Sequence, residues 1–329
     1  MPELFQAGTA VPHERTALRS AGVAGLGCAL PERFVSSDQI ERHLGVEAGW
    51  IERRTGIAGR RHIGASESLT GLATAAGAAA LADAGVAADQ LDLVLVATMA
   101  ADDLLPNAAP LVAHALGTTA AATDVGAACT GFLAALALAA PAIETGRAEH
   151  VLIIGAETMS RHVDHDDKRT APLFGDGAGA AVLSAGAGAV GPVVLRSDGA
   201  QAQLITASRE RGVIEMQGHE TFIAAVARLS EATADAVAAA GAALDDVDLF
   251  VYHQANRRIL AAIAQRLELD PARIVDAIGD MGNTSAASVP LTLCQAADEG
   301  RLSPGDRVLV AAAGAGFTYG AALLEWGGA

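Results

Sequence analysis

The sequence predicts an α/β fold of five layers, α/β/α/β/α, built from two duplicated halves. Ala-rich helical stretches alternate with short runs of Val, Leu and Ile, an alternation typical of sheets covered by helices. The same succession of helix, glycine and strand occurs twice along the chain. Alternating strands and helices also favour mainly parallel sheets, so we expect two halves of this kind to pack into one layered body.

Residues 1–20 precede the first predicted strand as a loose or partly docked extension. They carry charges throughout and lack the apolar stretch of a secretory signal. The chain also contains no uninterrupted apolar run of about 18 residues, the length needed to cross a bilayer. We therefore expect a cytoplasmic protein with no membrane partner.

The first repeated feature is a helix that ends at a glycine before a short strand. The first half has Gly85, then Asp92 seven residues later, then the apolar strand LVLVA. The second half has Gly241, then Asp248 at the same spacing, then LFVYH. Glycine after a helix and β-rich runs after the loop are ordinary stop and strand signals.

The second repeated feature is a spacing of 17 residues, from Cys129 to Gly146 and again from Asn283 to Gly300. Each glycine is followed by an arginine and then by a strand, VLIIGA or VLVAAA. Four landmarks in one order indicate an internal duplication, although Ala-rich sequences match one another easily.

Composition indicates a large core and argues against nucleic-acid binding. The 329 residues are 51% hydrophobic, which is enough for a large core shared by two halves. The formal net charge of −16 argues against nucleic-acid partners, which need a basic surface.

The three cysteines, Cys28, Cys129 and Cys294, form no CxxC pair, so neither a metal site nor a disulfide framework is expected. We interpret Cys28 and Cys294 as packing residues. Cys129 differs because it begins an apolar helix, where the positive end of the helix dipole favours a thiolate and lowers a thiol pKa.

We place the boundary between the halves in the Gly-rich stretch SAGAGAVGP, giving residues 21–190 with Cys129 and residues 191–329 with His253 and Asn283. Ligands of parallel α/β proteins bind beyond the carboxyl ends of the strands. Cys129 and Asn283 each begin a helix and His253 ends a strand, so the duplication predicts that the three side chains converge. Taken singly, each also has an ordinary structural explanation: a packing cysteine, a core histidine and a helix-capping asparagine.

Together, these residues and their surroundings resemble β-ketoacyl-ACP synthase III, of the thiolase superfamily, over about residues 21–326. The strings that carry the resemblance are WIERRTGI (50–57), FGDGAGAAVL (174–183), HQAN (253–256), GNTSAAS (282–288) and GFTYG (316–320). The resemblance implies a thiolase-like five-layered αβαβα fold and a homodimer. It also implies a ping-pong reaction in which acyl-CoA and then malonyl-acyl carrier protein (malonyl-ACP) react, both as substrates, with no cofactor and no metal.

The resemblance also implies roles for particular residues. Cys129 would become acylated, while His253 and Asn283 would stabilise the enolate formed from the malonyl thioester. The backbone N–H groups of Cys129 and Ala315 would form the oxyanion hole. In the family pattern, CoA contacts fall on Trp50, Arg54, Arg169 and Arg258, carrier-protein docking on Arg257, Arg258 and Arg266, and the acyl pocket on Leu105, supplied across the dimer interface.

One departure from the family pattern and several alternative functions bear on this interpretation. Ile223 stands where the family often has a lysine, which weakens the case for carrier docking. A thiolase would need a cysteine in AAAGAGF, and a hydroxymethylglutaryl-CoA synthase would need an acid in VATMAA; both are missing. A relative that acylates a different nucleophile, giving an ester, a pyrone or a starter-unit product, stays open. A non-enzymatic scaffold that binds the carrier is disfavoured because all three reactive residues are present.

Overall fold

The computed structural model describes residues 18–327, so nearly all of the predicted extension, residues 1–20, lies outside the described residues. The chain is anchored from Arg19 onward. The Arg19 backbone N–H donates to the carbonyl of Glu144 at 3.1 Å, and its guanidinium forms an ion pair with Glu149.

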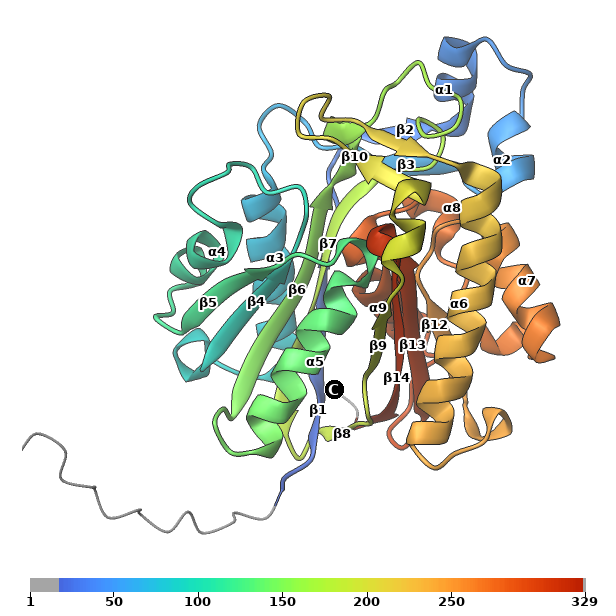
Figure 1. Ribbon diagram of the computed structural model, residues 1–329. Helices are drawn as coiled ribbons and strands as arrows, with labels where there is room; N and C mark the ends of the chain where they lie inside the picture. The colour runs from blue at the N-terminus through green and yellow to red at the C-terminus, as the bar shows by residue number, and fades with distance from the viewer. Residues whose placement is uncertain (1–17, 328–329) are drawn as a thin grey trace, which may run out of the picture.

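Two large sheets form the frame of the molecule (Figure 1). The first has the strand order β1 (Ala21–Ala29), β7 (Asp176–Ala185), β6 (His150–Thr158), β4 (Leu93–Ala97), β5 (Ala121–Val125). The second has the order β12 (Leu249–Tyr252), β13 (Arg307–Gly314), β14 (Thr318–Trp326), β8 (Gly188–Val190), with β9 (Val194–Ser197) also beside β14. The chain therefore crosses between the sheets within the Gly-rich stretch that separates β7 from β8.

The prediction of mainly parallel sheets was wrong. β4 pairs in parallel with β5 and β6, and β12 pairs in parallel with β13, but the other pairings in both sheets are antiparallel. The reason is visible at β13 and β14, which are joined by only residues 315–317. A parallel crossover needs about a dozen residues, and a connection this short must therefore reverse the direction of the chain.

The duplication is present in the topology. The strands β4, β6 and β7 have the same order and directions as β12, β13 and β14. The repeated aspartates explain part of the repeated sequence. Asp92 accepts from the backbone N–H of Glu149, next to β6, and Asp248 accepts from that of Arg307, at the start of β13. Each aspartate thus ties one strand to its parallel neighbour.

Five layers result, as predicted. α5 (Gly131–Glu144) and α9 (Ser288–Asp298) lie between the sheets and contact both, and their apolar residues form the central core. The outer face of the first sheet is covered by α3 (Leu69–Ala84) and α4 (Ala108–Leu116), and that of the second by α6 (Gly218–Ala239) and α7 (Arg257–Leu267). None of the helices described is long and apolar enough to cross a membrane.

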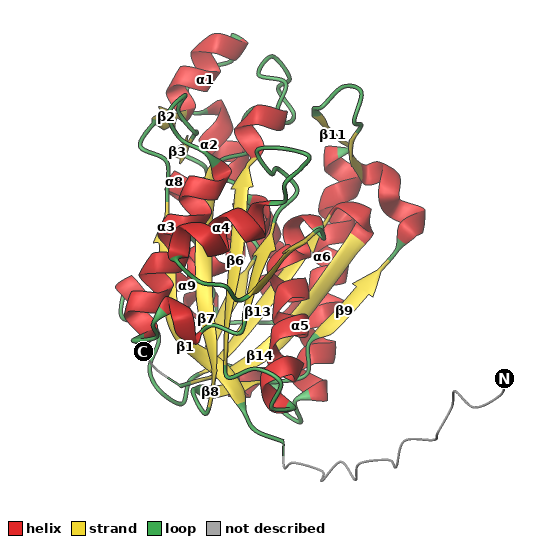
Figure 2. Ribbon diagram, turned by 90° about the vertical axis from the view of Figure 1, so that its left-hand side faces the viewer, coloured by secondary structure: helices red, strands yellow, loops and turns green. Residues whose placement is uncertain are grey.

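Smaller elements gather at the end of the molecule toward which β6 runs (Figures 1 and 2). This end therefore also holds the carboxyl ends of β4 and β5. The smaller elements are α1 (Ser37–Leu44), α2 (Trp50–Thr55), α8 (Ile278–Met281), β2 (Phe34–Ser36), β3 (Gly59–Arg61), β10 (Ile205–Ala207) and β11 (Ile214–Met216).

Candidate active site

Cys129 lies in a single 3₁₀ turn, Ala128–Thr130, that leads directly into α5. Ala128 has φ +46°, a left-handed conformation that costs a residue with a side chain roughly 1–2 kcal/mol. Thr130 holds the turn by donating to the carbonyl of Ala127 at 2.7 Å, and its hydroxyl oxygen also lies within hydrogen-bond distance of Thr318 Oγ1 at 2.9 Å. The nucleophile candidate is thus presented by a strained turn fastened to the second sheet.

The equivalent turn in the second half is Ser285–Ala287, before α9, and its first residue, Ser285, also has φ near +50°. By backbone conformation Ser285 therefore matches Ala128, so Cys129 matches Ala286. The sequence-based alignment of Cys129 with Asn283 is therefore off by three residues. Counting 17 residues to a glycine misled it, because α9 has 11 residues and α5 has 14.

His253 directly follows β12, and its backbone N–H donates to the carbonyl of Ala311 at 2.8 Å. The side chain is 2% exposed. Burial lowers the pKa of His253 to about 4, so the imidazole is neutral at neutral pH. Its Nδ1 atom is buried and has no hydrogen-bond partner among residues 18–327.

Asn283 is held by both its backbone and its side chain. Its N–H donates to the carbonyl of Leu173 at 2.8 Å, and its Oδ1 accepts from the N–H of Ser285 at 2.9 Å. Because Oδ1 must be the acceptor in that contact, the side-chain NH₂ is the group left to donate to a ligand.

Gly314, at the end of β13, allows the second sheet to approach the nucleophile. A Cβ atom at this position would lie 2.7 Å from Cβ, 3.0 Å from Sγ and 3.0 Å from the backbone nitrogen of Cys129. The next residue is Ala315, so the two backbone segments predicted to form an oxyanion hole lie side by side.

The three predicted catalytic residues line one cavity of about 260 Å³, together with Ser285 and Ala315. Its walls are largely apolar, and they include Met159, Leu173, Phe174, Ile205, Ile214, Met216, Phe222, Ile259 and Phe317. The cavity lies between the halves, because Cys129 belongs to the first and His253 and Asn283 to the second.

The electrostatics at Cys129 differ from the sequence-based expectation. Part of the residue is exposed, yet burial raises the pKa of its thiol to about 11; a hydrogen bond with Ser285 acts to lower this pKa and the nearby Glu157 acts to raise it. Burial therefore outweighs the helix start, and at neutral pH the thiol is protonated in the free protein.

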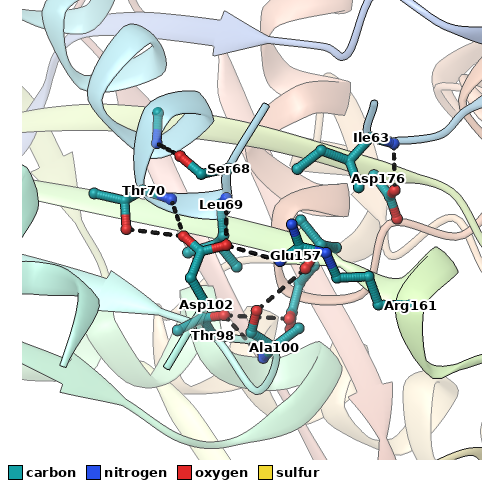
Figure 3. Close-up of polar contacts among 12 residues, drawn as sticks. Ile63, Ser68, Leu69, Thr70, Thr98, Ala100, Asp102, Glu157, Arg161 and Asp176 are labelled. Carbon is teal, nitrogen blue, oxygen red and sulfur yellow. Dashed lines mark hydrogen bonds and ion pairs between the residues drawn. The ribbon is translucent and has the colours of Figure 1, made fainter. Parts of the chain in front are cut away.

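Sequence reasoning missed Glu157, near the end of β6. Its side chain is 0% exposed and accepts from Ser285 Oγ at 3.0 Å, the Met99 N–H at 3.1 Å and Thr98 Oγ1 at 3.3 Å. Burial raises the pKa of Glu157 to about 7, although these hydrogen bonds oppose the shift. Figure 3 shows Glu157 beside Thr98. The available signal was an acidic residue at the end of an otherwise apolar strand, VLIIGAET.

The four predicted CoA contacts lie outside the main cavity. Trp50 and Arg54 are on α2, with the guanidinium of Arg54 over the indole at 4.4 Å. Arg169 is exposed and paired with Asp167 at 3.0 Å. Arg258 lines a side pocket that shares Gly218, Phe222 and Asn256 with the main cavity.

α2 and α7 are neighbours, which brings Trp50 and Arg54 near the helix that carries Arg258. A Cβ at Gly56, which ends α2, would lie 2.7 Å from Cβ of Arg257, which begins α7. The buried Glu41 holds the start of α2 by accepting from the N–H groups of Gly49 and Ile51 at 2.8 and 2.7 Å.

The three arginines predicted to dock a carrier protein do not share one face. All lie on α7, but Arg257 forms an ion pair with Asp276 and lies nine residues before Arg266, which is half a turn out of phase at 3.6 residues per turn. Arg258 and Arg266 are closer in phase, and both are exposed.

Leu105 is 82% exposed and does not line the cavity of its own chain. It lies beside Leu104, which is 84% exposed, and Met99, also exposed, belongs to the same loop and lines the cavity. The loop thus reaches from the site to the surface.

Comparison with known proteins shows which family the chain is similar to. The family model for 3-oxoacyl-[acyl-carrier-protein (ACP)] synthase III matches residues 123–199, and the model for the C-terminal part of that enzyme matches residues 237–326. The chain is 45% identical over 314 residues to β-ketoacyl-[acyl-carrier-protein] synthase III 2 of Streptomyces coelicolor, covering 94% of each protein.

Solved structures give the same result. The 3-oxoacyl-[acyl-carrier-protein] synthase III of Aquifex aeolicus is 36% identical and superposes with a TM-score of 0.91, covering 93% of this chain and 100% of that one. The priming β-ketosynthase of the R1128 polyketide pathway is 35% identical, with a TM-score of 0.89 and coverage of 95% and 98%. The chain therefore belongs to the β-ketoacyl-ACP synthase III family of thiolase-like condensing enzymes.

Proposed function

We propose that this chain condenses an acyl-CoA starter with malonyl-ACP, with loss of CO₂, and so initiates fatty acid or related polyketide synthesis. The observation that carries the proposal is the single apolar-walled cavity lined by Cys129, His253 and Asn283. A thiol, an imidazole and a carboxamide at one site supply a nucleophile and two neutral hydrogen-bond donors.

In the first half-reaction, Cys129 Sγ attacks the thioester carbon of acyl-CoA. The S–C(acyl) bond to Cys129 forms, the bond to the CoA sulfur breaks, and CoA leaves. The backbone N–H groups of Cys129 and Ala315 would hold the oxyanion of the tetrahedral intermediate. One such donor typically contributes about 3 kcal/mol of transition-state stabilisation.

In the second half-reaction, malonyl-ACP loses CO₂ and the resulting enolate attacks the acyl group on Cys129. The NH₂ of Asn283 suits the thioester carbonyl, because its Oδ1 is already occupied by Ser285. The low pKa of His253 suits the same role, since a neutral imidazole can donate a hydrogen bond to the enolate without protonating it early. Loss of CO₂ supplies the driving force.

The substrates would enter beside α2 and α7. Trp50 would stack on the adenine of CoA, and Arg54, Arg169 and Arg258 would face its phosphates as forked donors. The exposed Arg258 and Arg266 would receive the acidic carrier, whereas Arg257 is paired with Asp276 and lies on the other side of the helix from Arg266. A local basic patch is required because the chain as a whole has a net charge of −16.

The same proposal includes a homodimer in the cytoplasm, with Leu105 of each chain completing the acyl pocket of the other. The exposure of Leu104 and Leu105, and the outer position of β5 in its sheet, support such an interface. CoA and ACP thioesters are substrates, and the reaction as written needs no cofactor.

Mass spectrometry of the intact protein after incubation with acyl-CoA tests the first half-reaction. We expect an acyl adduct on Cys129 and none on the Cys129→Ala variant; no adduct on the unmodified protein would support a binding scaffold. Addition of malonyl-ACP should then release CO₂ and a β-ketoacyl-ACP. An ester or pyrone product instead would identify the relative that acylates another nucleophile.

A further inference from the structure

The buried carboxyl of Glu157 lies next to the reactive cysteine and has no part in the chemistry described above. It reaches the site through Ser285, whose hydroxyl donates to Glu157 Oε1 at 3.0 Å and whose turn, Ser285–Ala287, packs against the turn that carries Cys129. Ser285 lines the cavity, so this chain of contacts runs from the reacting sulfur to a carboxyl that is 0% exposed.

The backbone fixes each member of this chain of contacts. Ser285 has φ near +50°, and its N–H donates to Asn283 Oδ1 at 2.9 Å. The second carboxyl oxygen of Glu157 accepts from the Met99 N–H and from Thr98 Oγ1. With both oxygens engaged, the carboxyl is held facing Ser285, and Ser285 lines the same cavity as Cys129.

The thiol needs a proton acceptor because it is protonated at neutral pH in this environment. His253 is also neutral there, but protonating it would place a charge on a fully buried imidazole whose pKa burial has already lowered to about 4. Glu157 has the opposite preference, because burial favours its protonated, uncharged form.

We propose that Ser285 passes the proton of the Cys129 thiol to Glu157 during acylation, with Glu157 acting as the general base that accepts it. The S–H bond of Cys129 breaks as its sulfur bonds the acyl carbon. The thiol proton moves to Ser285 Oγ, and the serine proton moves to Glu157 Oε1. CoA departs as the thiolate and takes a proton from solvent. When the enolate later displaces Cys129, Glu157 returns the proton by the same path.

This inference rests on the proposed function, and it predicts a specific pH dependence. The groups that face Glu157 are Thr98 and Met99 after β4, Ser285 and the backbone of Ala286 before α9, and Cys129 before α5. Cys129 is the titratable one among them. Only the ionised carboxyl can accept a proton, so the acylation rate should rise with pH through an apparent pKa near 7 and then level off.

The experiment measures single-turnover acylation of Cys129 by acyl-CoA between about pH 5.5 and 9, using mass spectrometry. In Glu157→Gln the rise near pH 7 should disappear, and the rate at pH 8 should fall by about 100-fold, the lower range of general-base effects. Ser285→Ala should behave alike, because it interrupts the path while leaving the carboxyl in place. Alanine suits this conformation, since Ala128 adopts it in the first half.

Asp176→Asn provides the matched control. Asp176 is also 0% exposed, but it accepts from the N–H groups of Ile63 (Figure 3) and Ser160 and does not line the cavity that holds Cys129. This variant should keep the rise near pH 7 even if its stability falls. Glu157→Asp, with a shorter acid, should recover a titrating rate that Glu157→Gln lacks.

The outcomes separate the two proposals. If the unmodified protein forms no adduct at Cys129, the proposed function fails. If the adduct forms and Ser285→Ala and Glu157→Gln keep the normal pH profile with rates within twofold, only the proton path is overturned. Should Glu157→Gln fail to fold, Ser285→Ala alone decides the question.

Discussion

At the scale of single residues, the site depends on a position that has no side chain. The backbone of β13 passes so close to Cys129 that only glycine fits at position 314. Since φ of Gly314 is −166°, its conformation is open to any residue, and the restriction comes from space alone.

We therefore expect Gly314→Ala to displace the nucleophile. A new Cβ would meet Cβ, Sγ and the backbone nitrogen of Cys129. Overpacking of this kind typically costs about 1–3 kcal/mol, here as strain that moves Cys129 from its position. Acylation of Cys129 should fall by about 100-fold, measured as adduct formation. Gly199→Ala is the control, since a Cβ there meets nothing within 4 Å. Normal acylation in Gly314→Ala would contradict this account of the turn.

Buried Glu157 should also make stability depend on pH. Its folded-state pKa of about 7 lies above the ordinary value of 4.5, so between these pH values the folded protein binds more protons than the unfolded chain. Stability from this group is present below about pH 4.5 and is lost as pH rises to 7, on the order of 3 kcal/mol in total.

Glu157→Gln should remove that loss. Urea unfolding at pH 5 and pH 8 would measure it as a smaller difference in the free energy of unfolding between the two pH values than in the unmodified protein. The pKa of His253 is shifted in the opposite direction, so this residue destabilises the fold as pH falls from 6.5 toward 4. Its contribution is the same in both proteins and cancels in the comparison. Identical pH dependence in the two proteins would show that Glu157 titrates normally.

The reactive residues could be predicted from sequence because each lies in a recognisable local string, and the structure brings Cys129, His253 and Asn283 to one cavity. Glu157 could not be paired with Ser285 in this way, because 128 residues separate them and their contact exists only once the halves pack. The predicted thiol pKa had the wrong direction for the same reason: the helix start is local, whereas the burial that outweighs it comes from distant segments.

At the scale of elements, the loop after β4 is held by one carboxylate. Asp102 accepts from the N–H groups of Leu69 and Thr70 at the start of α3, both at 3.0 Å, and pairs with Arg161 at 2.7 Å (Figure 3). The same loop carries Met99, whose N–H holds Glu157. Asp102 therefore links the start of a helix to the active-site loop.

Asp102→Ala should destabilise the protein by about 1–3 kcal/mol, because it leaves helix N–H groups and Arg161 without their acceptor. Asp102→Asn should lose less, since an amide oxygen can still accept. Chemical denaturation measures both. The neighbouring Asp103 is exposed and makes no hydrogen bond or ion pair within the described chain, so Asp103→Ala should be neutral. Equal effects at 102 and 103 would rule out this anchoring.

Element order was predictable where spacing carried it: the glycine stops, the aspartates and the strands after them all occur as expected. Strand direction was not recognised, although the short AGF connection (315–317) between β13 and β14 contains the information. The alignment of Cys129 with Asn283 was offset because the helices that follow them differ in length, which residue spacing alone conceals.

At the scale of the whole molecule, the proposed homodimer depends on the exposed apolar loop. Leu105→Asp should place a charge in the interface and shift the protein to monomers in sedimentation equilibrium, at little cost to the folded chain because the side chain is 82% exposed. Ile223→Asp, an exposed apolar position on α6, should remain dimeric. A stable dimer in Leu105→Asp would exclude this loop from the interface.

The five-layered architecture could be predicted because the repeat, the Ala-rich helices and the apolar strands all indicate the same arrangement, and the structure confirms it. Contacts made between chains lie beyond what spacing can supply. Leu105 is exposed in the single chain, so its place in an acyl pocket stays a prediction.

The most direct measurement separates the two half-reactions in His253→Ala and Asn283→Ala. Adduct formation on Cys129 and CO₂ release from malonyl-ACP are followed in the same preparations. We predict that both variants still acquire the acyl group, within a few-fold of the normal rate, yet release CO₂ at least about 100-fold more slowly. Equal loss of both half-reactions, or normal CO₂ release in either variant, would contradict the division of labour between the thiol and its two neutral donors.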